Sequence, residues 1–104
     1  MIDKEKVEQQ IIGTLKTVYD PEIPVDVYEL GLIYVIDIED DGNVKIEMTL
    51  TAPGCPVAGD LVEEVTRKVE AIEGIQKVDV DIVWSPPWNK DMMSLDAKYK
   101  LGFI

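Results

Sequence analysis

Residues 44–51, VKIEMTLT, constrain the fold most strongly, because apolar and polar side chains alternate there without a break. Successive side chains of a β-strand point to opposite faces, so this alternation predicts a strand with one apolar face and one polar face. The apolar set is Val44, Ile46, Met48 and Leu50, and the polar set is Lys45, Glu47, Thr49 and Thr51. A strand of this kind is not stable by itself, so other strands and covering helices are expected.

Two more segments predict strands. Residues 32–39 precede the turn sequence DDGN at 40–43, so residues 32–51 predict a β-hairpin. Residues 76–84 alternate again, with Asp79 and Asp81 on the polar side. The polar face of the sheet, formed by Lys45, Glu47, Thr49, Asp79 and Asp81, is expected to face water or a partner.

Helical spacing of apolar residues predicts two longer helices. The first covers residues 4–19, with Asp3 as its N-cap and with its end before Asp20-Pro21, because proline disfavours helical geometry in the preceding residue. The second covers residues 56–73 and stops at Gly74. Residues 89–100 predict one or two short helical pieces, capped by Asn89 and Ser94.

The resulting order is helix, strand, strand, helix, strand, helix, which predicts an α+β fold with two layers. The helix between strands 44–51 and 76–84 implies that those two strands run parallel, whereas the hairpin strands are antiparallel. A small mixed sheet with helices on one face is therefore expected. The pattern leaves open which strand lies beside residues 76–84. With 104 residues, the chain predicts a single domain spanning 1–104.

Charge and residue usage exclude several classes of function. The chain has 10 Lys and Arg against 21 Asp and Glu, a formal charge of −11, so nucleic acid and anionic membranes are not expected partners. It has no His and one Cys, which excludes a Ser-His-Asp triad, a Cys-His pair and a Cys₂His₂ zinc site within one chain. The N-terminal MIDKEKVEQQ has no apolar signal core, so a cytoplasmic location is expected.

The single thiol, Cys55, lies in the sequence TAPGCP. Pro56 suits the first position of the predicted helix, which makes Cys55 its N-cap. Free backbone N–H groups and the helix dipole would favour the thiolate, the form that binds metal or attacks an electrophile. From spacing alone, a metal ligand and a small buried cap remain equal interpretations. The cysteine corner comprises Thr51, Pro53, Gly54, Cys55 and Pro56.

Two other stretches are candidates for function. The acidic loop DPEIP carries Asp20, Pro21 and Glu22, whose carboxylates are either hard metal ligands or a local turn former. The stretch SPPWNKDMMS is either an exposed recognition surface or a rigid lid packed on the sheet. Its candidate residues are Trp88, Asp91, Met93 and Ser94.

Together, DPEIPVDVYELGLIY, MTLTAPGCPVAGDL and WSPPWNKDMMSLDAKYKLG resemble the small iron–sulfur assembly domains that include SufT and PaaD. The eukaryotic subunit that targets cytosolic iron–sulfur clusters to client proteins is also similar. The resemblance covers nearly the whole chain, and its three motifs occur in the family's order. By motif match, the acidic loop, the cysteine corner and the C-terminal residues Trp88, Asp91, Met93 and Ser94 correspond to the family's functional positions.

The resemblance implies a fold like that of the NifU C-terminal domain and a non-enzymatic role in iron–sulfur protein maturation. It implies iron–sulfur assembly proteins and apo-clients as partners, with iron or a cluster held only transiently by Cys55. Because a cluster normally needs four ligands, one Cys per chain predicts a cluster shared with a homodimer partner, a client or a small thiol.

Two alternatives stay open at this point. The chain could be an adaptor without metal, serving one client such as a ring-hydroxylating or phenylacetate-pathway oxygenase. It could also be a thiol enzyme with Cys55 as nucleophile and Asp20 or Glu22 as base, although a carboxylate is a weak base for a thiol.

Overall fold

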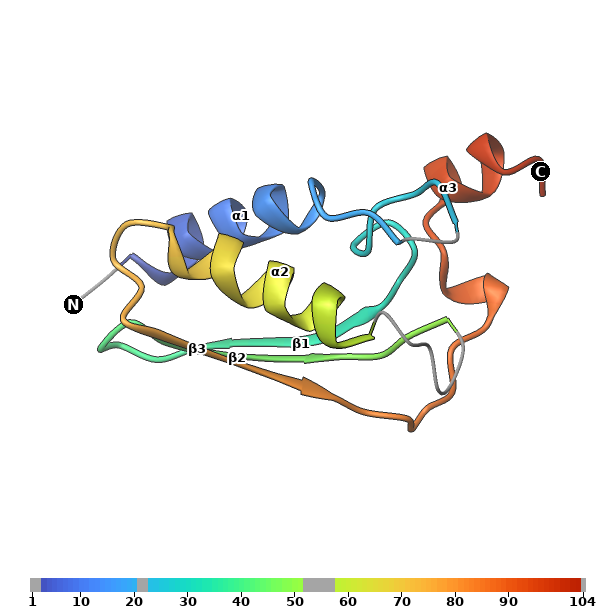
Figure 1. The fold of residues 1–104 in the computed structure, drawn as a ribbon. Coiled ribbons are helices and arrows are strands. Elements are labelled where there is room, and N and C mark those ends of the chain that lie inside the picture. Colours follow the sequence, from blue (N-terminus) through green and yellow to red (C-terminus); the bar gives the residue numbers. More distant parts are fainter. Residues whose placement is uncertain (1–2, 21–22, 52–57, 104) are drawn as a thin grey trace.

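The computed structural model describes residues 3–20, 23–51 and 58–103. The elements appear in the predicted order, and the C-terminal region forms two short helical pieces, one of the two possibilities that the sequence allowed (Figure 1). They are α1 (Lys4–Leu15), β1 (Ile33–Ile38), β2 (Asn43–Met48), α2 (Ala58–Glu70), β3 (Lys77–Ile82), the 3₁₀ helix η1 (Lys90–Met92) and α3 (Leu95–Lys100).

The three strands form one mixed sheet in the order β1-β2-β3. β1 and β2 are antiparallel and are joined by the predicted turn, in which Gly42 adopts a φ of 94°. β2 and β3 are parallel, in register from Asn43 opposite Lys77 to Met48 opposite Ile82. The expected strand directions are confirmed, and β3 lies beside β2, the choice that the sequence left open.

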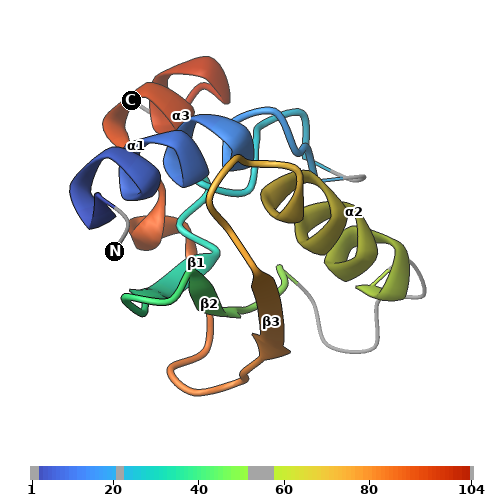
Figure 2. The same ribbon diagram turned by 90° about the vertical axis from the view of Figure 1, so that its left-hand side faces the viewer.

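Helices α1 and α2 lie side by side over one face of the sheet, and Figure 2 shows the two layers from the end. The predicted two-layer arrangement is therefore confirmed for these helices. α3 differs, because it lies beyond the end of α1 and does not cover the sheet (Figure 1). None of the described helices has both the length and the apolar character that a membrane span requires.

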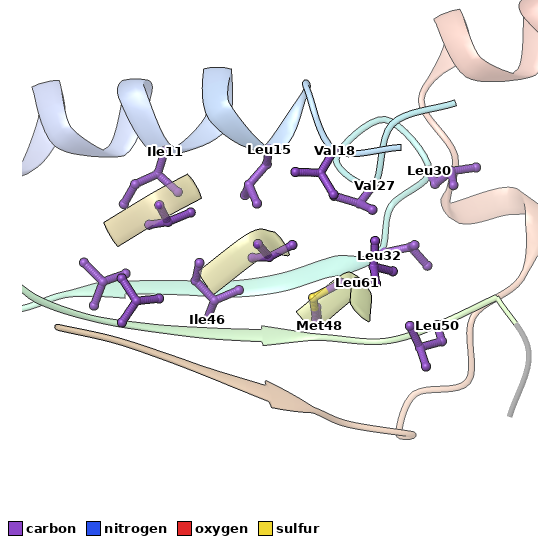
Figure 3. Close-up of a cluster of buried hydrophobic side chains, with 14 of the residues drawn as sticks. Ile11, Leu15, Val18, Val27, Leu30, Leu32, Ile46, Met48, Leu50 and Leu61 are labelled. Atoms are coloured by element: carbon purple, nitrogen blue, oxygen red, sulfur yellow. The ribbon is translucent and has the colours of Figure 1, made fainter. Parts of the chain in front are cut away.

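The core lies between the two helices and the sheet (Figure 3). Its side chains come from the apolar stripes that the sequence predicts, and Ile11, Leu15, Ile46, Met48, Val65 and Val69 have no exposed surface. Each such side chain contributes roughly 1.5–3 kcal/mol by leaving water. On the opposite face Lys45, Asp79 and Asp81 are exposed as expected, and Glu47 is half-buried.

Thr49 is an exception, because only 1% of its surface is exposed although the alternation assigned it to the open face. Residues 84–88 fold back over this end of the sheet, and Thr49 lines a cleft together with Pro87 and Trp88. The expectation that Thr49 faces water was wrong because an interaction distant in sequence covers it.

α1 ends at Leu15, four residues earlier than expected. The N–H groups of Thr17 and Val18 donate to Thr14 and Leu15 in tight turns. Val18 then accepts the Val27 N–H at 2.8 Å, and Tyr19 forms a β-bridge with Asp26. Pairing with the following loop thus replaces the last helical turn. The predicted cap at Asp3 is confirmed, since its carboxylate accepts the Lys6 N–H.

Candidate functional site

An apolar cleft of about 350 Å³ lies at the end of the sheet where β2 and β3 terminate. Its described lining is Thr49, Leu50, Thr51, Trp84, Pro87 and Trp88. Thr51 belongs to the predicted cysteine corner and Trp88 to the C-terminal motif, so the structure brings these two motifs together. Figure 3 shows Leu50 at the same end of β2. A cleft of this size matches the lower range of ligand and side-chain pockets in proteins.

A hydrogen bond to the preceding turn fixes the position of Trp88 in the wall of the cleft. Its indole Nε1–H donates a hydrogen bond of 2.7 Å to the carbonyl of Leu30. This bond uses the only donor of the side chain, so the ring can contribute an apolar surface to the cleft. The turn that contains Leu30 follows the acidic loop and is closed by hydrogen bonds from the Leu30 N–H to Asp26 and from the Gly31 N–H to Tyr28.

Residues 84–94, called the strap, cross the turn at residues 26–32 and the start of β1, and they contact both. Besides Trp88, the Ser94 N–H donates to the Glu29 carbonyl at 2.8 Å. At the third point the Tyr34 hydroxyl donates to the Pro86 carbonyl at 2.9 Å. The strap therefore connects the segment after the acidic loop with the cleft beside residues 49–51.

The strap and the turn approach each other closely at Gly31. A Cβ built on Gly31 would lie 2.2 Å from the backbone oxygen of Met92, and the φ of Gly31 is 80°. Both the contact and the backbone conformation exclude an ordinary side chain. Glycine at this position lets η1 lie directly on the turn.

Tyr34 of β1 contacts both the strap and Thr49, the residue that follows β2. Burial raises the pKa of the Tyr34 hydroxyl, and a hydrogen bond with the Thr49 side chain offsets part of that rise. The hydroxyl is therefore protonated near neutral pH and remains a donor to Pro86. It also lies 3.5 Å from the Met92 sulfur. Sequence reasoning treated Tyr34 only as part of a strand, because its partners in the strap, Pro86 and Met92, are more than 50 residues away.

The acidic loop is described at Asp20 but not at Pro21 and Glu22, which lie outside the described residues. Asp20 is 8% exposed, and its carboxylate accepts the Ile23 N–H at 2.9 Å. Its own N–H donates to Val25. These contacts are those of a turn former, one of the two roles that the sequence left open for this loop.

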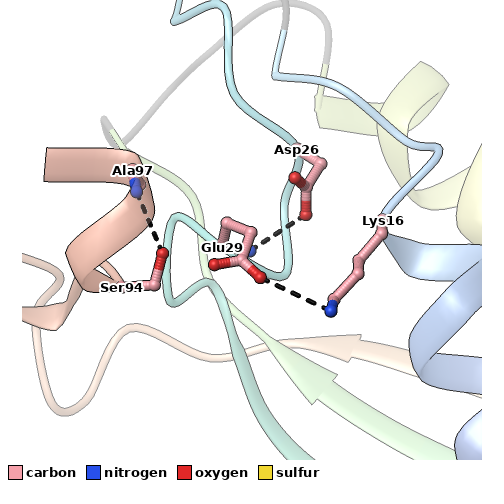
Figure 4. A network of polar contacts seen from close by, with 5 residues as sticks. All are labelled: Lys16, Asp26, Glu29, Ser94 and Ala97. Carbon is pink, nitrogen blue, oxygen red and sulfur yellow. Dashed lines mark hydrogen bonds and ion pairs between the residues drawn. The ribbon is translucent and has the colours of Figure 1, made fainter. Parts of the chain in front are cut away.

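A second carboxylate in the region was missed by the sequence reasoning. Asp26 is buried and accepts the Glu29 N–H at 2.9 Å, while Glu29 forms an ion pair with Lys16 at 3.6 Å (Figure 4). The spacing D-x-x-E at 26–29 is a known helix-start signal and could have revealed it. The ion pair between Glu29 and Lys16 joins the end of α1 to the turn that the strap crosses.

The remaining residues of the C-terminal motif have mainly structural positions. Met93 is buried in the core, and the Ser94 hydroxyl accepts the Ala97 N–H, which confirms Ser94 as the cap of α3 (Figure 4). Asn89 is confirmed as the cap of η1, where it accepts the Asp91 N–H. Asp91 itself is exposed, and it is absent from the described lining of the cleft.

Pro53, Gly54, Cys55 and Pro56 of the cysteine corner lie outside the described residues, and so does the predicted cap at Cys55. Along the chain, Cys55 comes four residues after Thr51 and its cleft. Over residues 3–20, 23–51 and 58–103, no three acidic or thiol side chains are grouped as a metal site.

Comparison with known proteins identifies the family. Residues 8–82 match the family model described as iron–sulfur cluster assembly protein. The chain belongs to this family. The resemblance drawn from the three motifs is thereby confirmed, and the match includes the acidic loop, the cysteine corner and all three strands.

Relatives with similar sequences cover most of the length of this chain. An "Fe-S protein maturation auxiliary factor" of Porphyromonas gingivalis is 52% identical over 95% of this chain and 94% of the relative. The "Fe-S protein maturation auxiliary factor SufT" of Staphylococcus aureus is 46% identical over 82% and 97%. A crystal structure of a "Domain of Unknown Function DUF59" from Bacillus anthracis superposes with a TM-score of 0.89, at 38% identity over 96% and 95%.

Proposed function

We propose that this chain is an accessory factor in iron–sulfur protein maturation that helps assemble clusters or deliver them to apo-client proteins. The observation that carries the proposal is the match to maturation auxiliary factors over nearly full length. In this role the chain is not an enzyme, and its partners are iron–sulfur assembly proteins and apo-clients.

Cys55 is the residue proposed to contact the cargo. It is the only thiol of the chain, and thiolates are the usual ligands of iron–sulfur clusters. One thiol cannot hold a cluster alone, so the other ligands come from a client, a small thiol or a second copy of the chain. Cys55 therefore acts as a transient ligand during transfer, without a resident cluster.

The position of the apolar cleft supports this proposal. Thr51 lines the cleft, and the chain continues from it to Cys55 within four residues. A partner bound at the cleft would therefore contact a part of the chain that is four residues from Cys55 in sequence. Asp20 and Glu22 of the acidic loop are proposed to assist, either by orienting this end of the molecule or by adding oxygen ligands during transfer.

A second candidate is an adaptor that binds partners without touching metal. The apolar cleft favours this function, because protein partners recognise such surfaces whether or not metal is present. In that case Cys55 only starts a helix, and the clients are selected by contacts around Trp84 and Trp88. A cytoplasmic location and a homodimer are compatible with both candidates and are part of the same proposal.

Two substitutions of Cys55 separate these candidates. Serine is a preferred helix N-cap but a poor cluster ligand, whereas alanine is neither, and replacing a cap by alanine costs about 1 kcal/mol. If Cys55 is a ligand, Cys55→Ser and Cys55→Ala both abolish maturation. If it is only a cap, Cys55→Ser retains maturation and only Cys55→Ala lowers stability.

The assay is the specific activity of an iron–sulfur enzyme in cells that depend on this chain for maturation. Protein level and urea unfolding of each variant are measured in parallel. Iron and sulfide bound to anaerobically purified chain are determined for wild type and both variants. Full maturation activity with Cys55→Ser would refute the ligand role.

A further inference from the structure

An acidic surface adjoins the apolar cleft on the open face of the sheet, which is the face that α1 and α2 do not cover. Glu47 in β2 lies directly opposite Asp81 in β3, so two carboxylates occupy one cross-strand pair. Like charges opposite one another destabilise a sheet. Along the strands this pair comes two residues before Thr49 and three before Trp84, which both line the cleft.

The lysines on this face neutralise only part of the charge. Lys45 lies 3.7 Å from Asp81, and Lys77 lies 3.9 Å from Asp79. Lys45 is also in register with Asp37 of β1 and with Asp79 of β3. This one lysine therefore has three aspartates as neighbours, including Asp81. Within the described ranges, no basic side chain lies within ion-pair distance of Glu47. The open face thus carries four acidic side chains and two basic ones.

The cleft adds two indole rings to this acidic face. Trp84 is 49% exposed although it is one of the largest side chains of the chain. The described lining carries no charged side chain. An exposed tryptophan in an apolar cleft is typical of the centre of a protein interface, where one anchor side chain supplies most of the binding energy.

We propose that the cleft and the adjoining carboxylates bind a basic segment of a partner protein, with an apolar anchor in the cleft and Lys or Arg side chains against Glu47 and Asp81. The inference rests on the proposed function, since this partner is a client or assembly protein. Charge complementarity selects a basic segment, because the chain carries −11 overall. A second copy of the chain is not the expected occupant of this face, because it would bring two such acidic faces together; a homodimer would use another surface.

The proposed partner gives the two opposed carboxylates beside the cleft a role in binding. A bound cation would neutralise Glu47 and Asp81 together, so the repulsion of the free chain is relieved only in the complex. Cationic side chains also interact favourably with tryptophan rings, which lets a lysine or arginine pass over Trp84 towards the carboxylates.

The test uses the full chain and three synthetic peptides with blocked ends: KKLFLKK, EELFLEE and KKSGSKK. Both tryptophans of the chain line the cleft, so intrinsic fluorescence and the two indole N–H signals in an NMR titration report on this site. KKLFLKK is expected to shift both indole signals. The acidic and the non-apolar peptides are each expected to bind at least about tenfold more weakly, a difference of ~1.4 kcal/mol.

Variants locate the binding. Trp84→Ala is expected to weaken KKLFLKK at least about tenfold, and Glu47→Gln about two- to fivefold with a smaller dependence on salt. Tyr99→Ala is the matched control, because Tyr99 is also aromatic and 75% exposed but lies on α3. The affinity of the Tyr99→Ala variant for KKLFLKK is expected to stay within about twofold of the wild-type affinity.

The inference is overturned if KKLFLKK does not bind at about 1 mM, if EELFLEE binds equally well, or if Trp84→Ala binds like wild type. Cys55→Ser is expected to bind KKLFLKK unchanged. A chain that supports maturation but fails the peptide test refutes this inference alone. A chain that binds the peptide but has no maturation role refutes the proposed function alone.

Discussion

Replacing Gly31 by alanine tests whether the strap is fixed by direct backbone contact with the turn. Alanine at a φ of 80° loses about 1–2 kcal/mol relative to glycine. Its Cβ would also lie 2.2 Å from the Met92 oxygen, and relieving such overpacking costs about 1–3 kcal/mol. The sum predicts that Gly31→Ala lowers the free energy of unfolding by about 2–5 kcal/mol. A domain of this size has roughly 5–15 kcal/mol in total.

Two other glycines separate the contributions. Gly102 has nearly the same φ, 81°, but a Cβ there meets nothing within 4 Å. Gly102→Ala is therefore expected to show only the backbone cost. Gly13 lies in the last turn of α1 with open space around it, and Gly13→Ala is expected to stabilise the chain by up to about 1 kcal/mol.

The measurement is urea unfolding of the three variants beside wild type, followed by circular dichroism and by tryptophan fluorescence. Because Trp88 is bonded to Leu30 next to Gly31, the fluorescence of folded Gly31→Ala should also change. If Gly31→Ala is no less stable than Gly102→Ala and its fluorescence is that of wild type, the close packing of η1 on the turn is refuted.

Three more predictions concern side chains of the same region. Because its folded pKa is raised, Tyr34 contributes stability that is fully present below about pH 10 and is lost as the pH rises through the folded pKa. Wild type should therefore lose more stability than Tyr34→Phe as the pH is raised above about 10 in alkaline unfolding curves, and parallel curves would contradict this. Glu47→Gln removes one charge of the pair with Asp81 and should raise the free energy of unfolding by about 0.2–1 kcal/mol in urea; a loss would show that the pair is not repulsive. Ser94→Ala removes the cap of α3 and should cost about 1 kcal/mol, with faster amide exchange at Ala97 than in wild type as the local check; unchanged exchange would argue against the cap.

The sequence predicted the elements well where the pattern is local. The alternation from Val44 to Met48, the turn at Gly42 and the caps at Asp3, Asn89 and Ser94 depend on neighbours within a few residues, and the structure confirms them. The parallel β2–β3 pair also followed, because a helical crossover leaves little choice of direction.

The errors arise where distant segments meet. α1 stops at Leu15 because residues 18 and 19 pair with 26 and 27, and nothing in the helical stripe signals this pairing. Thr49 is buried by the strap, and Tyr34 bonds to Pro86, 52 residues along the chain. Of the candidate site residues, Thr51 and Trp88 were brought together at the cleft, whereas Met93 and Ser94 have structural roles.

The way in which the strap is attached has a consequence for the order in which this protein loses structure. The strap is joined to the turn and to β1 by a few hydrogen bonds between partners more than 50 residues apart. Of its residues only Met93 is buried in the core that the sheet and the two covering helices share, with Trp88 packed against that core, and most of the others are exposed. Segments with few buried contacts open at lower free energy than the core does. Amide hydrogens of residues 84–94 should therefore exchange through a local opening that leaves β2 and α2 protected. The end of the molecule that bears the cleft can thus reshape around a partner while the rest of the domain stays folded.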